Sequence, residues 1–447
     1  MSKFSFFSDL VNTLFDKKNR KKNFSSLFEK KQNKSLLEYI ENVNDAKGEI
    51  SALNYSEELL DYLSQCDQKT LISFFEYLER DYDLDISLIE EVLKNYNKKK
   101  EYNFYKDIKK ISESKRSEIF RRLNSTQHGT INLVKLREKL LDLLDKYPNF
   151  RKIDFDLSSL FKDWFNRGFL ILKPIDWETP ANILEKIIEY EAVHQIKSWD
   201  ELRSRLEPQD RKCFAYFHPA MEDEPLIFIE VALTEDMPEK INQILNPDRT
   251  MINSEEATTA VFYSISNCQK GLQGISFGNF LIKQVAKDLQ NNFENLSKFV
   301  TLSPVPGFSK WLKSNDTTLF DKMYNKLSTT KIQKNEIILN ENILKYFFIS
   351  KRLDYLPNDP VARFHIGNGA ILERINFLSD TSEKGLEQSL GFMVNYLYNL
   401  EEVEINHEKY VVDKKINTSK SLEKEFIKLN IEICLLYTSD AADDRMR

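Results

Sequence analysis

His365 is one of five histidines in this 447-residue chain, and it stands beside a turn. It ends a predicted strand over 361–365, and the turn Ile366-Gly-Asn-Gly369 follows at once. An imidazole can transfer a proton near neutral pH, and glycine lets a ligand approach the backbone closely. The alternative is a histidine whose ring only satisfies a turn carbonyl. The local sequence leaves both interpretations open.

Three serines end or line predicted strands. Ser303 follows a predicted strand over 299–302, and Pro304 restricts its backbone to extended conformations. A serine before proline is commonly only a turn residue. No G-x-S-x-G motif surrounds Ser303, so a hydrolase has no local support. Ser264 and Ser266 alternate along an earlier strand, which places them on one side of it and predicts that they form part of a pocket wall.

A glycine-bearing loop separates a predicted strand over 261–266 from a predicted helix that begins at Asn279. It contains Gly271, Gly274 and Gly278. Backbone N–H groups at such a helix start, together with the helix dipole, favour an anion such as a pyrophosphate. The spacing matches neither the G-x-G-x-x-G fingerprint nor a P-loop. A phosphate-binding loop and a simple tight turn are therefore both compatible with this segment.

The first part of the chain has the pattern of long helices. All 12 prolines lie at or after Pro148, and only Gly48 and Gly129 of the 11 glycines precede it. Apolar residues recur at three- and four-residue intervals, which predicts helices over 4–15, 35–44, 57–65, 69–80, 87–97, 116–124 and 131–145. Residues 1–168 are expected to form an all-helical domain.

The second part alternates strand-like and helical patterns, which is typical of an α/β domain. We place it at 169–433, after Gly168 ends a helix. Predicted strands lie at 169–174, 213–218, 226–233, 261–266, 299–302, 361–365 and 393–400, and predicted helices at 181–190, 237–244, from 279 on, 316–327, 336–349 and 370–378. Residues 434–447 resemble translated adapter sequence, so we expect them to be a non-native tail.

Composition excludes several function classes. The formal net charge of −6 gives no electrostatic reason to expect nucleic acid or an anionic membrane as partner. The four cysteines, Cys66, Cys213, Cys268 and Cys434, are scattered without metal-binding spacing. No run of 18 apolar residues and no signal peptide is found. We therefore expect a reduced, metal-free, cytoplasmic protein.

Several segments together resemble, in the same order, segments of the malonyl-CoA decarboxylase family. They are HPAMEDEPLIFIEVAL (218–233), FYSISNCQKGLQGISFGNFLIKQV (262–285), FVTLSPVPGFSKWL (299–312) and DPVARFHIGNGAILERINFLSDTS (359–382). The resemblance implies an α+β fold class: an N-terminal all-helical bundle domain followed by a GNAT-like α/β catalytic domain that binds acyl-CoA. It also implies a homo-oligomer, a dimer or a tetramer, to which the helical domain contributes.

The same resemblance implies roles for individual residues. The family's LSP-x-PGF and RFH-x-x-NGA segments carry its catalytic serine and histidine, at the positions of Ser303 and His365. The loop from Gln273 to Gly278 is similar to the pyrophosphate loop of the GNAT fold, with Ser276 in place of its first glycine. The implied substrate-binding or coenzyme A-binding residues are Ser264, Ser266, Gln273, Gly274, Ser276, Gly278, Asn368, Asn395 and Tyr398, although the last three can equally be hydrogen-bonded core residues.

The implied reaction converts malonyl-CoA to acetyl-CoA and CO2, with no cofactor beyond the coenzyme A thioester that is the substrate. Either Ser303 or His365 would deliver the proton, and a covalent Ser-acyl route with His365 as base is the other option. Two alternatives belong to other function classes. One is a GNAT-type acyltransferase with an amine acceptor, and the other is a non-catalytic scaffold that senses acyl-CoA.

Overall fold

The computed structural model describes residues 34–98, 102–275, 277, 281–327, 336–350, 352 and 356–428. The chain divides into two compact units. The first comprises Met1–Phe169 with Pro219–Glu222 and Gln269–Ile275, and the second comprises Leu170–His218, Asp223–Cys268 and Ser276–Arg447. The glycine-bearing loop thus groups in part with the helical unit.

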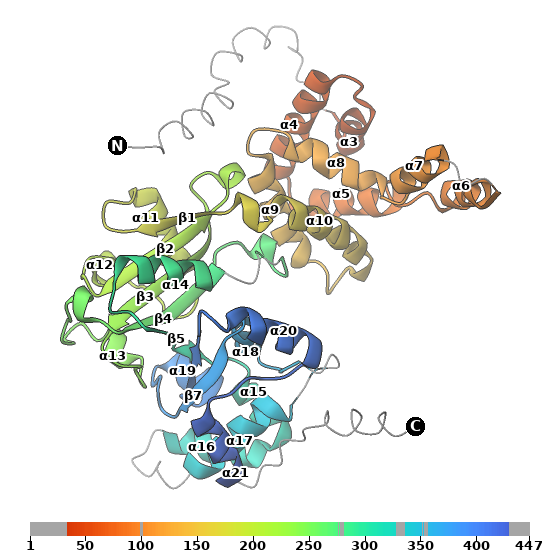
Figure 1. Ribbon diagram of the computed structural model, residues 1–447. Helices are drawn as coiled ribbons and strands as arrows, with labels where there is room; N and C mark the ends of the chain where they lie inside the picture. The colour runs from red at the N-terminus through yellow and green to blue at the C-terminus, as the bar shows by residue number, and fades with distance from the viewer. Residues whose placement is uncertain are drawn as a thin grey trace, which may run out of the picture. The chain divides into compact units, whose positions relative to one another are not determined.

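The first unit is helical in its described part (Figure 1). Its α-helices are α3 (Leu36–Asp45), α4 (Glu49–Gln65), α5 (Gln68–Asp81), α6 (Ile86–Lys98), α7 (Tyr102–Ile111), α8 (Lys115–Asn124), α9 (Gly129–Leu141) and α10 (Arg151–Trp164). Side-chain caps begin several of them: Ser35 forms a capping box with Glu38, and Asp67 accepts a hydrogen bond from the Thr70 N–H. Fully buried aromatic residues, among them Phe74, Phe120 and Phe161, form the core.

The second unit is built on an eight-stranded mixed sheet of order β1-β2-β3-β4-β5-β8-β6, with β7 paired to β8 (Figure 1). The strands are β1 (Ile171–Ile175), β2 (Arg211–Phe217), β3 (Pro225–Thr234), β4 (Thr259–Asn267), β5 (Lys298–Thr301), β6 (Ser303–Pro304), β7 (Ile371–Asn376) and β8 (Met393–Leu397). The α-helices are α11 (Ala181–Tyr190), α12 (Trp199–Leu206), α13 (Asn242–Leu245), α14 (Leu281–Asn292), α15 (Phe308–Asn315), α16 (Thr317–Leu327), α17 (Glu336–Phe348), α18 (Pro360–Gly367), α19 (Glu383–Ser389), α20 (Val403–Asp413) and α21 (Lys420–Lys428). The expected α+β class is confirmed.

Helices cover both faces of this sheet. On one face, inward residues of β2 and β3 such as Ala215 and Phe228 pack with apolar residues of α11 and α12. Alternation along β2 turns Tyr216 to the opposite face, where its hydroxyl donates a hydrogen bond of 2.8 Å to the Leu281 carbonyl of α14. The central strands β2, β3 and β4 are therefore buried on both sides, whereas most of β1 is exposed.

Strands β4 and β5 form the one parallel pair among the described strands, and their pairing is short. The register runs from Thr259–Lys298 to Phe262–Thr301, although β4 continues to Asn267. Beyond this point Ser303 pairs instead with Val394 of β8. The pairing of β4 with β5 therefore ends just before Ser303.

Three expected elements around the site are wrong. His365 lies on a helix, α18, and not on a strand, because Asp359 caps the helix and Pro360 occupies its first position. The expected helix over 370–378 is the strand β7, since Gly369 at φ +81° ends α18 and the following residues pair with β8. The expected helix over 237–244 shrinks to α13. The expected helix over 4–15 lies outside the described residues.

Candidate active site

Three side chains from separate elements meet at the site. The Ser303 Oγ lies 3.0 Å from Nε2 of His365, and the Tyr398 hydroxyl lies 2.8 Å from Nδ1 of the same ring. All three are buried, with 6%, 3% and 2% of their surfaces exposed. Each ring nitrogen therefore has one hydroxyl partner, and a hydroxyl can donate or accept. This is the geometry of a proton relay.

The elements explain how these residues meet. Helix α18 is fixed at its start by Asp359, which accepts a hydrogen bond of 2.8 Å from the Ala362 N–H, and it carries His365 in its last turn. Tyr398 follows β8, and its N–H donates a hydrogen bond of 2.8 Å to the Phe299 carbonyl of β5. The Tyr396 ring stacks on the imidazole with ring centroids 4.6 Å apart. The ring orientation of His365 is thus set from two sides.

A second layer of contacts holds Ser303. Its hydroxyl also lies 2.9 Å from Oγ1 of Thr301, which in turn accepts a hydrogen bond of 3.2 Å from the Tyr396 N–H. Asn395 donates a hydrogen bond of 2.8 Å to the Thr301 carbonyl. Asn395 therefore supports the strand end that carries Ser303, as a fully buried core residue.

The electrostatics of the pair follow from burial. Burial lowers the pKa of His365 to about 3, and among the described residues no carboxylate contributes to offset the cost of an imidazolium. Burial also raises the pKa of Tyr398 well above its ordinary value. At neutral pH both groups are uncharged, so the site can pass protons along hydrogen bonds without holding a resident ion.

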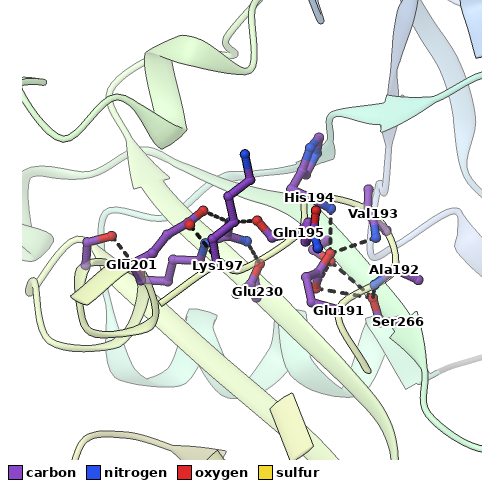
Figure 2. A network of polar contacts seen from close by, with 12 residues as sticks. Glu191, Ala192, Val193, His194, Gln195, Lys197, Glu201, Glu230 and Ser266 are labelled. Atoms are coloured by element: carbon purple, nitrogen blue, oxygen red, sulfur yellow. Dashed lines mark hydrogen bonds and ion pairs between the residues drawn. The ribbon is translucent and has the colours of Figure 1, made fainter. Parts of the chain in front are cut away.

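Other expected site residues occupy different surroundings. Asn368 is the C-cap of α18, and its side chain donates a hydrogen bond of 2.7 Å to the Phe364 carbonyl. Ser264 and Ser266 of β4 lie 2.7 and 3.3 Å from the same Glu191 carboxylate oxygen, Oε2. The other oxygen of Glu191 accepts hydrogen bonds from the N–H groups of the loop after α11, as Figure 2 shows. The two serines share a face, as predicted, and hold this loop.

The glycine-bearing loop is described only in part. Gln273 and Gly274 belong to the first unit, whereas Ser276 and Gly278 lie outside the described residues. Arg137 of α9 donates hydrogen bonds of 2.7 and 2.9 Å to the carbonyls of Gly271 and Gln273, and pairs with Asp154 at 2.7 Å. Gly274 has φ +78°, a conformation that favours glycine.

Sequence reasoning missed several residues of the site. Thr301, Tyr396 and Asp359 were not singled out, although all three contact the catalytic candidates or their elements. Of these three residues, only Asp359 could have been identified from the sequence, since an aspartate before proline is a typical helix start. Among the described residues no cluster could hold a metal ion, and no helix is long and apolar enough to cross a membrane.

Comparisons with known proteins agree on one family. A model described as the malonyl-CoA decarboxylase C-terminal domain matches residues 168–434, and a model of the N-terminal domain of the same enzyme matches residues 82–165. The protein named malonyl-CoA decarboxylase, mitochondrial, from Rattus norvegicus is 35% identical over 68% of this chain and 69% of its own. Its namesake from Anser anser anser is 34% identical, with 68% of each chain covered.

Solved structures give the same result. The malonyl-CoA decarboxylase from Rhodopseudomonas palustris superposes with a TM-score of 0.83 at 43% identity, covering 87% of this chain and 98% of that one. The enzyme of the same name from Agrobacterium vitis gives 0.82 at 42% identity with the same coverage.

Proposed function

This chain belongs to the malonyl-CoA decarboxylase family, a family of carboxy-lyases, and we propose that it converts malonyl-CoA to acetyl-CoA and CO2 with Ser303 and His365 as its catalytic pair. The observation that carries the proposal is the buried contact of 3.0 Å between the Ser303 Oγ and His365 Nε2. The two residues come from positions 62 apart in sequence and from separate elements. Their contact therefore depends on the fold.

The first chemical step breaks the bond between the α-carbon and the carboxylate. CO2 leaves, and the electron pair of that bond forms an enolate whose charge rests on the thioester oxygen. A preorganised donor at this oxygen is worth on the order of 3 kcal/mol. The Ser303 hydroxyl is our candidate donor, because Thr301 and His365 fix its position.

The second step adds one proton to the α-carbon and yields the acetyl group. The Ser303–His365 pair supplies this proton, and solvent restores it after the product leaves. His365 acts as a neutral relay, since its pKa of about 3 leaves almost no imidazolium at neutral pH. Tyr398 keeps the ring oriented and can exchange a proton with Nδ1. No cofactor enters the proposed reaction.

Recognition of the substrate is assigned to the glycine-bearing loop. Gln273, Gly274, Ser276 and Gly278 are proposed to bind the coenzyme A pyrophosphate, as the sequence pattern predicts. The φ of +78° at Gly274 is a turn conformation that favours glycine, as the pattern of this loop predicts. Ser264 and Ser266 support the substrate pocket through the loop that Glu191 holds. A homo-oligomer and a cytoplasmic location complete the proposal.

The test is incubation of the purified protein with malonyl-CoA and no acceptor amine. We expect acetyl-CoA and CO2 in equal amounts, with turnover abolished or strongly reduced in Ser303→Ala. A strict requirement for an amine would contradict the proposal and favour an acyltransferase. Tight binding of malonyl-CoA without turnover would also contradict it, and would favour a sensor.

A further inference from the structure

Asp359 is a fully buried carboxylate that touches the helix of one catalytic candidate and the segment of the other. On the His365 side, it caps α18 by accepting a hydrogen bond of 2.8 Å from the Ala362 N–H. On the Ser303 side, it lies beside Gly307, where an added Cβ atom would stand 3.9 Å from Oδ2 of Asp359. Gly307 follows Ser303 in the same segment and caps the start of α15.

Tyr346 of α17 closes this arrangement. Its hydroxyl donates a hydrogen bond of 3.3 Å to the second oxygen of Asp359. A Cβ atom at Gly307 would lie 2.2 Å from that hydroxyl, so glycine is required by the close approach of the ring. The backbone after Ser303, the tyrosine and the start of α18 therefore pack together without spare room.

We propose that Asp359 is a positioning residue whose carboxylate ties the segment after Ser303 to the helix that carries His365, and so sets the distance between their side chains. The inference rests on the proposed function of that pair. Both hydrogen bonds described for Asp359 come from donors, so these contacts favour its ionised form, whereas burial favours the protonated form. The link should therefore loosen when the carboxylate is protonated.

The surroundings of Asp359 bring its protonation into the pH range in which activity can be measured. Burial raises its pKa from 3.8 to about 6, and the hydrogen bonds from Ala362 and Tyr346, with the nearby N–H groups of Val361 and Gly307, oppose the rise. The titratable side chains that bear on it are Tyr346 from α17 and Tyr396 from β8, and Arg363 on α18 acts on the Tyr346 hydroxyl. Burial raises the pKa of both tyrosines, so neither changes charge between pH 5 and 8.

Activity and stability should respond to this group with opposite signs. Below about pH 6 the carboxylate is lost and kcat should fall. The folded pKa lies above 3.8, so the folded protein binds this proton more tightly than the unfolded chain does. By linkage, the contribution of Asp359 to stability rises as the pH falls from about 6 to about 4. Unfolding driven by this group therefore cannot explain the loss of activity.

The experiment measures kcat for malonyl-CoA between pH 5 and 8 in the full-length protein. Asp359→Asn keeps the size and the cap acceptor but cannot ionise. We expect its kcat at pH 7.5 to fall roughly tenfold with little change in KM, and the decline near pH 6 to vanish. Tyr346→Phe removes a hydrogen bond that lowers the pKa of Asp359, so the decline should move to higher pH. Wild-type kcat in Asp359→Asn, or an unchanged decline, would overturn the proposal.

Asp67 offers a matched control, because it also caps a helix through its side chain, at 2.8 Å from the Thr70 N–H, but in the other unit. Asp67→Asn should leave the dependence of kcat on pH unchanged.

If the wild-type protein fails to turn over malonyl-CoA, the proposed function fails. The positioning role of Asp359 is then tested separately by nitrogen NMR. The ring-nitrogen signals of His365 should shift with a midpoint near pH 6 in the wild type and not in Asp359→Asn. Their constancy in the wild type would refute the positioning role.

Discussion

His365 is enclosed by hydroxyls and an aromatic ring, and these neighbours determine its charge state and how it can transfer a proton. Its partners are Ser303, Tyr398 and the stacked Tyr396, none of which stabilises a positive charge as a carboxylate would. The pKa of about 3 follows from burial alone. A neutral imidazole can still exchange one proton for another at its two nitrogens, which suits a step that consumes a single proton.

The site residues differ in how far the sequence could predict them. Ser303 and His365 were reached through the family's motifs, since their local sequence also fits plain turn residues. Ser303 and His365 are 62 residues apart in the sequence, and His365 and Tyr398 are 33 residues apart. The periodicity of the sequence cannot predict contacts over such separations. Thr301 carries no motif and is recognised only by its place beside Ser303.

At the scale of elements, short segments around the site were the hardest to predict. Val361–His365 has the apolar character of a strand, but the cap at Asp359 and the proline after it make the segment a helix. By contrast, β3 and β4 are long, apolar and bounded by turn residues, and both were predicted within about two residues. Length alone did not decide the outcome, because the expected helix over 370–378 is the strand β7, whereas the short expected strand over 299–302 is found as β5.

The glycine-bearing loop gives a prediction at this scale. Arg137 is 3% exposed and binds two loop carbonyls, so Arg137→Gln should free the loop while leaving Ser303 and His365 unchanged. If the loop binds coenzyme A, KM for malonyl-CoA should rise roughly tenfold with kcat nearly constant. Steady-state kinetics on the purified variant measure both constants.

Arg116 is the control for this variant. It is equally buried in the same unit and pairs with Asp156 at 2.6 Å and Asp83 at 2.9 Å, without any described contact to the loop. Arg116→Gln should lose similar stability, because each variant leaves buried acceptors unpaired. Equal KM values in the two variants would show that stability, and not loop position, is responsible.

At the scale of the whole molecule, the composition of the sequence predicts two parts of the chain. The shift from a proline-poor, helical pattern to alternating strands and helices lies near Gly168, and the family models meet between residues 165 and 168. The sequence could not predict that Pro219–Glu222 and Gln269–Ile275 group with the helical unit. Such grouping depends on packing between distant residues, for example Gly271, where a Cβ atom would lie 1.9 Å from the Val134 carbonyl oxygen.

The helical unit also gives a prediction about assembly. Helix α6 exposes Ile86 and Leu93 by 58% and 41% of their surfaces, and because they are seven residues apart they lie on one face, which is a candidate contact between copies of the chain. Ile86→Lys combined with Leu93→Lys should lower the assembly state in sedimentation velocity. Ile337→Lys, at a residue of α17 that is 66% exposed, is the matched control. An assembly unchanged by the α6 variant would exclude this helix from the interface.

The central claim is that Ser303 and His365 act as one unit on the developing enolate, and a double-mutant cycle on malonyl-CoA turnover tests it most directly. Ser303→Ala and His365→Asn should each lower kcat by roughly 10²–10⁴ with modest changes in KM. Because residues that share a step are not additive, the double mutant should be little worse than either single mutant. Fully additive losses, or a His365→Asn enzyme with near-normal turnover, would contradict the account.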